Sequence, residues 1–253
     1  MTTRCNLIFS LVSLILVFPS CKDKVEGEPC DPEIALLKVS VQPVYGGETL
    51  YLDSTYSTTE GYDVQFTDLK FFAEDVRGAS AQLNTASLFD YRITGTDLFT
   101  GEGTPTDFAS LDGNLGVQSS VNHSDPSAFP NESILNISNS GGMHWGWNPG
   151  YIFMKVEAKV DTIPDGIALF DHNVVFHIGK DVNVQLLSFS NINWQQTGDL
   201  SHHFPLKLDM QTFLQNGTQT IDLQTEYTSH TASGQEAISL KVIENFKAAI
   251  SEY

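Results

Sequence analysis

Three separate segments of the chain carry its most chemically distinctive residues. Residues 122–126 include His123, residues 141–151 include Met143, His144, Trp145 and Trp147, and residues 176–179 include His177. Imidazole and thioether groups are ligands that suit the soft ion Cu(I). The face of an indole ring also attracts a monovalent cation, more strongly in a dry site. These residue types favour a soft metal site, but distance along the chain does not show whether the three segments meet.

The same residues also have a structural interpretation. Met143 and at least one of Trp145 and Trp147 would plug the core where a long loop rejoins a sheet. Asp125-Pro126 is typical of a turn closed by an Asx hydrogen bond, and a histidine at a strand end commonly bonds to a carbonyl group. The remaining histidines lie outside the three segments and receive no role: His172, His202, His203 and His230.

Composition and motifs argue against several other functions. Lys and Arg number 13 against 31 Asp and Glu, a formal net charge of −18, and such a surface repels the phosphate backbone of nucleic acids. The three cysteines form no Cys-x-x-Cys pair, which argues against a structural zinc site. The sequence has no nucleophile elbow, Ser-His-Asp arrangement or phosphate-binding glycine loop. A hydrolase is therefore the least favoured function, and we do not expect an enzyme.

The N-terminus has the features of an export signal. Arg4 precedes an apolar run from Leu7 to Phe18, which is too short to span a bilayer but suits a signal peptide. The following Pro19-Ser20-Cys21 resembles a bacterial lipoprotein signal in the looser form seen in Bacteroidetes. It implies that residues 1–20 are removed and that Cys21 is lipidated. An ordinary secretory signal with an incidental cysteine is the alternative.

Beyond this signal, residues 21–33 are predicted to be a flexible linker and residues 34–253 a single domain. Alternating apolar and polar residues predict strands at 37–41, 64–72, 152–160, 174–178, 182–186, 204–208 and 221–223. Many short strands punctuated by Gly, Pro, Asn and Asp indicate an all-β domain, an antiparallel β-sandwich of the immunoglobulin-like or a similar kind. In the strand at 174–178, His177 has the opposite parity to its apolar neighbours and is expected on the opposite sheet face.

Two further regions complete the predicted organisation. Residues 95–150 are rich in Gly, Ser, Asn and Asp, and so long a weakly patterned stretch predicts a functional loop. Near the C-terminus, Ile238, Val242, Phe246 and Ile250 recur every four residues and predict one amphipathic helix over Ser233–Ser251. Ser233 and Glu236 have the spacing of a capping box at its start.

The three chemically distinctive segments, in this order, resemble the MbnP-like family of bacterial periplasmic and lipid-anchored copper-binding proteins. The resemblance rests on Asn-His-x-Asp-Pro at 122–126, Met-x-Trp-x-Trp-x-x-Gly-Tyr at 143–151 and His-x-Gly at 177–179. Residues 62–72 also look like the first core strands of the family. The likeness extends over most of the chain after the signal, and the Met-x-Trp-x-Trp segment is its most specific part.

The resemblance implies a β-sandwich-like domain that binds copper, in some cases with a di-haem peroxidase partner that oxidises a tryptophan to kynurenine. With the family pattern added, His123 and His177 are expected to hold one copper ion. Met143 and His144 are further candidate ligands, and Trp145 or Trp147 would line the site.

The expected function is therefore acquisition, storage or delivery of copper by a lipoprotein of the cell envelope. Its anchor would lie in the outer membrane, facing the periplasm or the cell surface. The alternative is an envelope module that binds carbohydrate or peptide on an aromatic platform of Trp145, Trp147 and Trp194.

Overall fold

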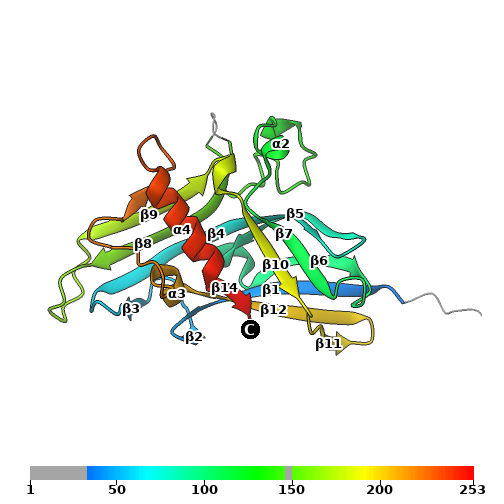
Figure 1. Cartoon of the computed structure of the whole chain (residues 1–253), viewed down its shortest axis with the longest axis horizontal. Coiled ribbons are helices and arrows are strands. Elements are labelled where there is room, and N and C mark those ends of the chain that lie inside the picture. The colour runs from blue at the N-terminus through cyan, green and yellow to red at the C-terminus, as the bar shows by residue number, and fades with distance from the viewer. Residues whose placement is uncertain (1–32, 146–149) are drawn as a thin grey trace, which may run out of the picture. The chain divides into compact units, whose positions relative to one another are not determined.

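The structure is a computed structural model, and it describes residues 33–145 and 150–253. The expected signal peptide, the linker up to residue 32, Cys21 and Trp147 lie outside the described residues. The described chain folds into two β-sheets with helices at their margins (Figure 1). No described helix is long and apolar enough to cross a membrane.

The six-stranded sheet has the order β11-β12-β1-β2, with β14 also beside β12 and β6 also beside β1. Its strands are β1 (Ala35–Tyr45), β2 (Glu48–Thr49), β6 (Asp97–Gly103), β11 (Gln195–Gly198), β12 (Ser201–Asp209) and β14 (Ile250–Glu252). Leu37, Val39 and Val41 of β1 are buried and alternate with more polar residues, as the predicted period of two requires.

The eight-stranded sheet has the order β10-β7-β4-β8-β9-β13, with β3 and β5 also paired to β4. Its strands are β3 (Thr55–Ser57), β4 (Asp63–Arg77), β5 (Gln82–Asp90), β7 (Ser110–Leu115), β8 (Ile152–Asp161), β9 (His172–Gly179), β10 (Gln185–Ser190) and β13 (Thr228–Ser229). The main apolar core lies between the two sheets. The predicted all-β, sandwich-like fold is therefore confirmed. Most strand pairs are antiparallel, but β1 pairs with β12 and β9 pairs with β13 in parallel.

One long strand explains the irregular apolar pattern of residues 64–72. A bulge between Phe66 and Asp68 shifts the register of β4 against β8. Because a bulge adds one residue to one strand, it moves the core-facing positions from even to odd numbers. Val64 and Phe66 face the core before the bulge, and Leu69 and Phe71 face it afterwards.

Two predicted strands differ from the structure. Val182 lies in the 3₁₀ helix η2 (Asp181–Asn183) and is exposed, as is Leu186. Lys180 has a left-handed backbone, with φ of 65°, and together with η2 it resets the register, so that β10 turns Leu187 and Phe189 toward the core. The predicted strand at 221–223 is wrong. Ile221 and Leu223 are buried, but they lie in a loop.

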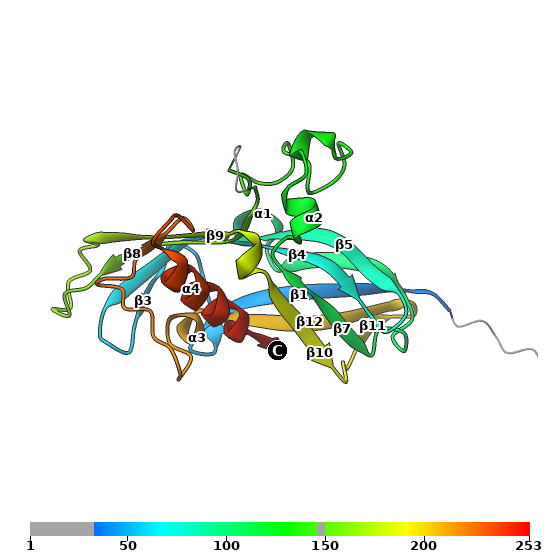
Figure 2. The same ribbon diagram turned by 45° about the horizontal axis from the view of Figure 1, so that its top comes forward.

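The predicted loop at 95–150 is shorter than expected, because β6 and β7 occupy part of it. The irregular part comprises the described residues 116–145 and 150–151 and contains α2 (Ser119–Asn122) and the 3₁₀ helix η1 (Pro126–Ala128). Figure 2 shows this segment rising above the eight-stranded sheet, on the side away from the other sheet. It covers that outer face through a second apolar cluster that includes Phe72, Leu135, Met143 and Tyr151.

The predicted C-terminal helix is present with different ends. The helix α4 spans Glu236–Ala249, and Ile250 belongs to β14. The capping-box prediction is wrong, because Gln235 is the N-cap and its side chain makes no cap hydrogen bond. Val242 and Phe246 are fully buried. Phe246 packs edge-on against Phe71 of β4 and Phe213 of α3 (Met210–Leu214). A further short helix in the described part of the chain is α1 (Tyr91–Thr94).

Candidate metal site

The three chemically distinctive segments meet at the C-terminal end of β9. The Asn122 side chain donates to Oδ1 of Asp181, over 2.8 Å, and accepts from the backbone N–H of Tyr151, also over 2.8 Å. Trp145 lies against Gly179, where a Cβ atom would approach its ring to 2.6 Å. Asn122 therefore ties the first segment to the second and to Asp181, just beyond the third, while Trp145 joins the second segment to the third. Distance along the chain did not show this convergence.

His123 sits at the surface beside a carboxylate. Its Nε2 atom lies 2.9 Å from Oδ2 of Asp181, and the imidazole is about half exposed. Burial alone would raise the pKa of Asp181, but hydrogen bonds from Ser119, Asn122 and His123 hold it below its usual range. The ionised Asp181 thus orients the His123 ring and leaves Nδ1 as the nitrogen that would face a metal.

His177 has the outer-face position that its parity predicts, and it also pairs with a carboxylate. Its Nε2 atom lies 2.8 Å from Oε1 of Glu157 on the neighbouring strand β8, and its side chain is 17% exposed. Burial lowers the pKa of His177, and the Glu157 carboxylate only partly opposes this effect. The imidazole is therefore neutral near pH 7, which is the form that binds metals.

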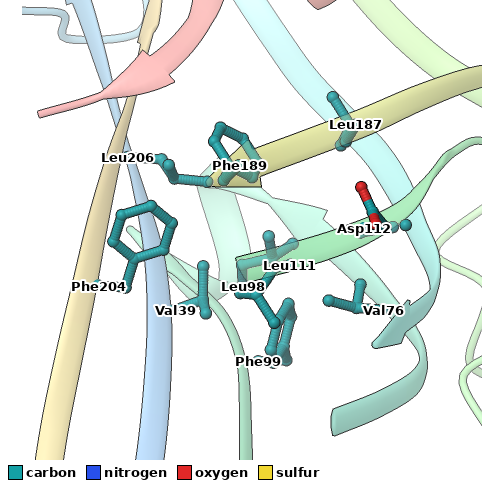
Figure 3. Close-up of a pocket in the computed structure, with 12 residues that line it drawn as sticks. Val39, Val76, Leu98, Phe99, Leu111, Asp112, Leu187, Phe189, Phe204 and Leu206 are labelled. Atoms are coloured by element: carbon teal, nitrogen blue, oxygen red, sulfur yellow. The ribbon is translucent and has the colours of Figure 1, made fainter. Parts of the chain in front are cut away.

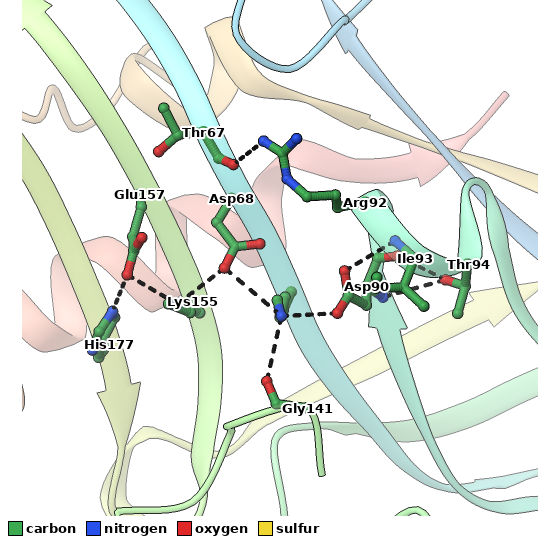
Figure 4. A network of polar contacts seen from close by, with 11 residues as sticks. Thr67, Asp68, Asp90, Arg92, Ile93, Thr94, Gly141, Lys155, Glu157 and His177 are labelled. Atoms are coloured by element: carbon green, nitrogen blue, oxygen red, sulfur yellow. Dashed lines mark hydrogen bonds and ion pairs between the residues drawn. The ribbon is translucent and has the colours of Figure 1, made fainter. Parts of the chain in front are cut away.

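A row of alternating charges extends from His177 across the outer face of the sheet (Figure 4). Glu157 pairs with Lys155 over 2.9 Å, and Lys155 pairs with Asp68 over 3.0 Å. Lys70 forms an ion pair with Asp90 over 2.8 Å and donates a hydrogen bond to the carbonyl of Gly141 over 3.3 Å.

These charged residues affect the candidate site in two places, beside His177 and before Met143. Burial alone would raise the pKa of Glu157, but Lys155 and His177 lower it, so the carboxylate beside His177 stays ionised. At the other end, the bond from Lys70 to Gly141 holds the loop two residues before Met143.

Met143 and His144 differ in their surroundings. The Met143 side chain is fully buried in the second apolar cluster, beside Phe72 and Tyr151, as the structural interpretation of the sequence requires. The His144 ring meets Tyr151 edge-on, with centroids 4.8 Å apart. Burial lowers the pKa of His144, and the negative charge of Asp125 acts in the opposite direction.

The two described tryptophans that were expected in an aromatic platform lie in different parts of the core. Trp145 packs against the second apolar cluster. Trp194 packs against Phe204 in the main core and donates its indole N–H to the carbonyl of Phe108. Trp147 lies outside the described residues. Trp145 and Trp194 therefore do not form one binding surface.

One cavity lies between the two sheets, but it is too small for an organic ligand. Figure 3 shows this cavity, which is lined by apolar side chains that include Val39, Leu111 and Phe204. Its volume is about 30 Å³, whereas pockets that enclose small organic ligands span roughly 300–1,000 Å³.

Sequence reasoning missed three neighbours of the candidate ligands: Asp181, Glu157 and His230. The His230 ring meets that of His177 edge-on, with centroids 4.9 Å apart. Glu157 has a weak signal in the sequence, because it lies on the polar side of a predicted strand. Neither Asp181 nor His230 lies in one of the matched motifs. Within residues 33–145 and 150–253, no three His, Cys, Asp or Glu side chains gather closely enough to hold a metal by themselves.

Comparisons with known proteins point to one family. A family model described as MbnP matches residues 35–233. No curated protein is significantly similar to the chain. A solved structure of MbnP from Methylosinus trichosporium is 15% identical, with a TM-score of 0.46, and the alignment covers 74% of this chain and 79% of that one.

Proposed function

Because the chain belongs to the MbnP family, we propose that it binds copper as its cargo in the cell envelope, for acquisition, storage or delivery. The observation that supports this proposal most is the pairing of two motif histidines with carboxylates at the point where three motif segments meet. His123 pairs with Asp181, and His177 pairs with Glu157. Histidines that bind metals usually direct their second ring nitrogen to such a partner, which fixes the ring and raises its basicity.

The donor types at this end of β9 fit copper. Imidazole and thioether ligands suit Cu(I), and a neutral His177 needs no deprotonation before it binds. His144 adds a third imidazole beside the Asn122–Tyr151 contact. Met143, in the apolar cluster below, lines the dry side of the site. The role we propose is binding rather than catalysis.

A tryptophan of the motif is the proposed target of a partner peroxidase. Hydrogen peroxide would be the oxidant. Two molecules of it cleave the C2–C3 bond of the indole to give N-formylkynurenine and two waters, and hydrolysis then releases formate and kynurenine. The resulting aniline and carbonyl groups can coordinate a metal, which indole cannot. Trp145, against Gly179 near His177, is the described candidate, and Trp147 is the other. Mass spectrometry of tryptic peptides from the native host tests this step.

The anchor is proposed to be the lipidated Cys21, with the copper-binding domain tethered to the outer membrane. Residues 22–34 separate Cys21 from the start of β1. The flexible linker predicted from the sequence would let the domain take copper from, or deliver it to, a partner in the same compartment.

Copper binding is tested by anaerobic titration of the full domain with Cu(I) against a chromophoric chelator. Losing even a residue that only hydrogen-bonds to a metal ligand usually lowers metal affinity by about 10–100-fold. His123→Ala and His177→Ala are each expected to lower the copper affinity by at least that much. His172→Ala is the matched control, because His172 lies at the other end of β9 and stacks on Tyr227. A wild-type domain that binds no copper would refute the function. Two variants that bind like wild type would refute only the assigned ligands.

A further inference from the structure

A second imidazole lies directly against His177, from a distant part of the chain. The rings of His177 and His230 are perpendicular, at 87°, and their centroids are 4.9 Å apart. We infer that His230 is a ligand of the same copper ion as His177, an inference that rests on the proposed copper function. The occupant is a soft monovalent cation, for which two imidazoles are a suitable pair of ligands.

The backbone next to His230 is strained. Thr231 has a left-handed φ of 54° and is buried. A β-branched residue rarely adopts this conformation, because its branched side chain crowds the backbone. Strained residues persist where the surrounding structure holds them, and they cluster at ligand-binding and catalytic sites. Thr231 is the only β-branched residue with positive φ among residues 33–145 and 150–253, and it adjoins His230.

Both hydrogen bonds of the Thr231 side chain lead to the strand that carries His177. The Thr231 hydroxyl donates to the carbonyl of His177, over 3.3 Å, and accepts from the N–H of Gly179, over 3.1 Å. The preceding strand β13 pairs with Val175 and Phe176 of β9. These bonds tie the segment that bears His230 to β9 on both sides of His177.

The start of α4 fixes the other side of the same segment. The Gln235 side-chain oxygen accepts from the backbone N–H of His230, over 2.9 Å, and from that of Ala232, over 3.1 Å. The Gln235 side chain therefore bonds to the loop that bears His230 and does not cap α4. The result is a short loop whose position relative to His177 is set by several independent bonds.

The surroundings suit a cation shared by the two rings. Glu157 holds Nε2 of His177 and supplies negative charge, while Lys155 neutralises part of it. A purely structural contact between the aromatic rings would need no nitrogen in the second ring. This difference gives the test.

The experiment compares Cu(I) affinities of the full domain and its variants by chelator competition. His230→Phe keeps an aromatic ring for the edge-on contact but removes its nitrogens, and His230→Ala removes the ring. Both are expected to lower affinity by about 10–100-fold, whereas the His172→Ala control leaves it unchanged. A His230→Phe variant that binds like wild type would overturn the inference.

A second measurement needs no variant at position 230. Cu(I) is diamagnetic, so ¹⁵N NMR of the wild-type imidazoles can follow each ring nitrogen during the titration. A stoichiometric shift of nitrogens in both His177 and His230 is expected. Copper binding that shifts His177 but not His230 would overturn this inference and leave the proposed function standing. An absence of copper binding by the wild type would instead overturn the proposed function itself.

Discussion

The Nε2 atom of His177 on β9 lies 2.8 Å from the carboxylate of Glu157 on β8, two residues that the sequence separates by nineteen others. Glu157 is not directly opposite His177, because Lys155 occupies that register position. The carboxylate therefore reaches diagonally along the sheet, between Lys155 and the imidazole. The carboxylate thus holds Nε2 of His177 and fixes the imidazole on the outer face of the sheet.

Glu157→Gln is expected to weaken Cu(I) binding by about 10–100-fold, because the amide carries no charge to polarise the ring. Chelator competition measures the affinity. Glu48→Gln, at an exposed position of β2, is the control and should have no effect. An unchanged affinity in Glu157→Gln would show that the carboxylate serves only the stability of the sheet.

Stability should fall as the pH drops below about 6.5, the ordinary pKa of histidine. Burial lowers the pKa of His144, His177 and His203 in the folded protein. The unfolded chain therefore takes up protons at a higher pH than the folded chain does, so acid favours unfolding. Urea titrations at about pH 7.5 and about pH 5.5 measure the difference. His177→Gln should show a smaller loss between the two, and an equal loss would contradict the role of burial at His177.

Gly179→Ala should destabilise the domain by about 1–3 kcal/mol, the usual cost of overpacking. The added Cβ would lie 2.5 Å from the carbonyl of Tyr151 and 2.6 Å from the Trp145 ring. Trp145 must then move, which tryptophan fluorescence would report. Gly198→Ala is the control, since its Cβ would be 3.5 Å from its nearest neighbour, Ser201. Wild-type stability and fluorescence in Gly179→Ala would show that the packing there is loose.

Phe246→Ala should lower the free energy of unfolding by about 3–5 kcal/mol, a large share of a typical domain's 5–15 kcal/mol. The ring is fully buried and meets both Phe71 and Phe213, so its loss leaves a cavity at the junction of α4, α3 and β4. Chemical denaturation measures the change. The exposed neighbour Lys247, changed to alanine, should cost less than about 0.5 kcal/mol.

Cys21→Ser should release the protein from membranes. Several acyl chains on one cysteine anchor a protein firmly, whereas a single chain binds only marginally. Detergent phase partitioning of cell extracts measures the anchor. Cys30→Ser, which changes the other cysteine of the predicted linker, should leave partitioning unchanged. A Cys21→Ser variant that stays in the detergent phase would refute the lipoprotein prediction.

Local patterns in the sequence determined much of the sheet structure. Alternation of apolar and polar residues identified β1, β8, β9 and β12, and parity alone placed His177 on the outer face. This works because successive side chains in a strand point to opposite faces. The same rule failed where the register changes. No pattern in the sequence revealed that Lys180 adopts a left-handed backbone. The alternation that predicted a strand at 182–186 therefore did not anticipate that Leu187 and Phe189 face the core.

Only the tertiary structure decided which polar side chains meet. Asp181, just after β9, reaches His123 at the end of α2. Glu157 and His230 reach His177 because β8, β13 and the loop before α4 pack around β9. Each contact joins residues that are far apart in the chain, and contacts of this kind depend on sheet register and loop closure rather than on any local pattern. The sequence thus identified the motif histidines, while the tertiary structure selected their partners.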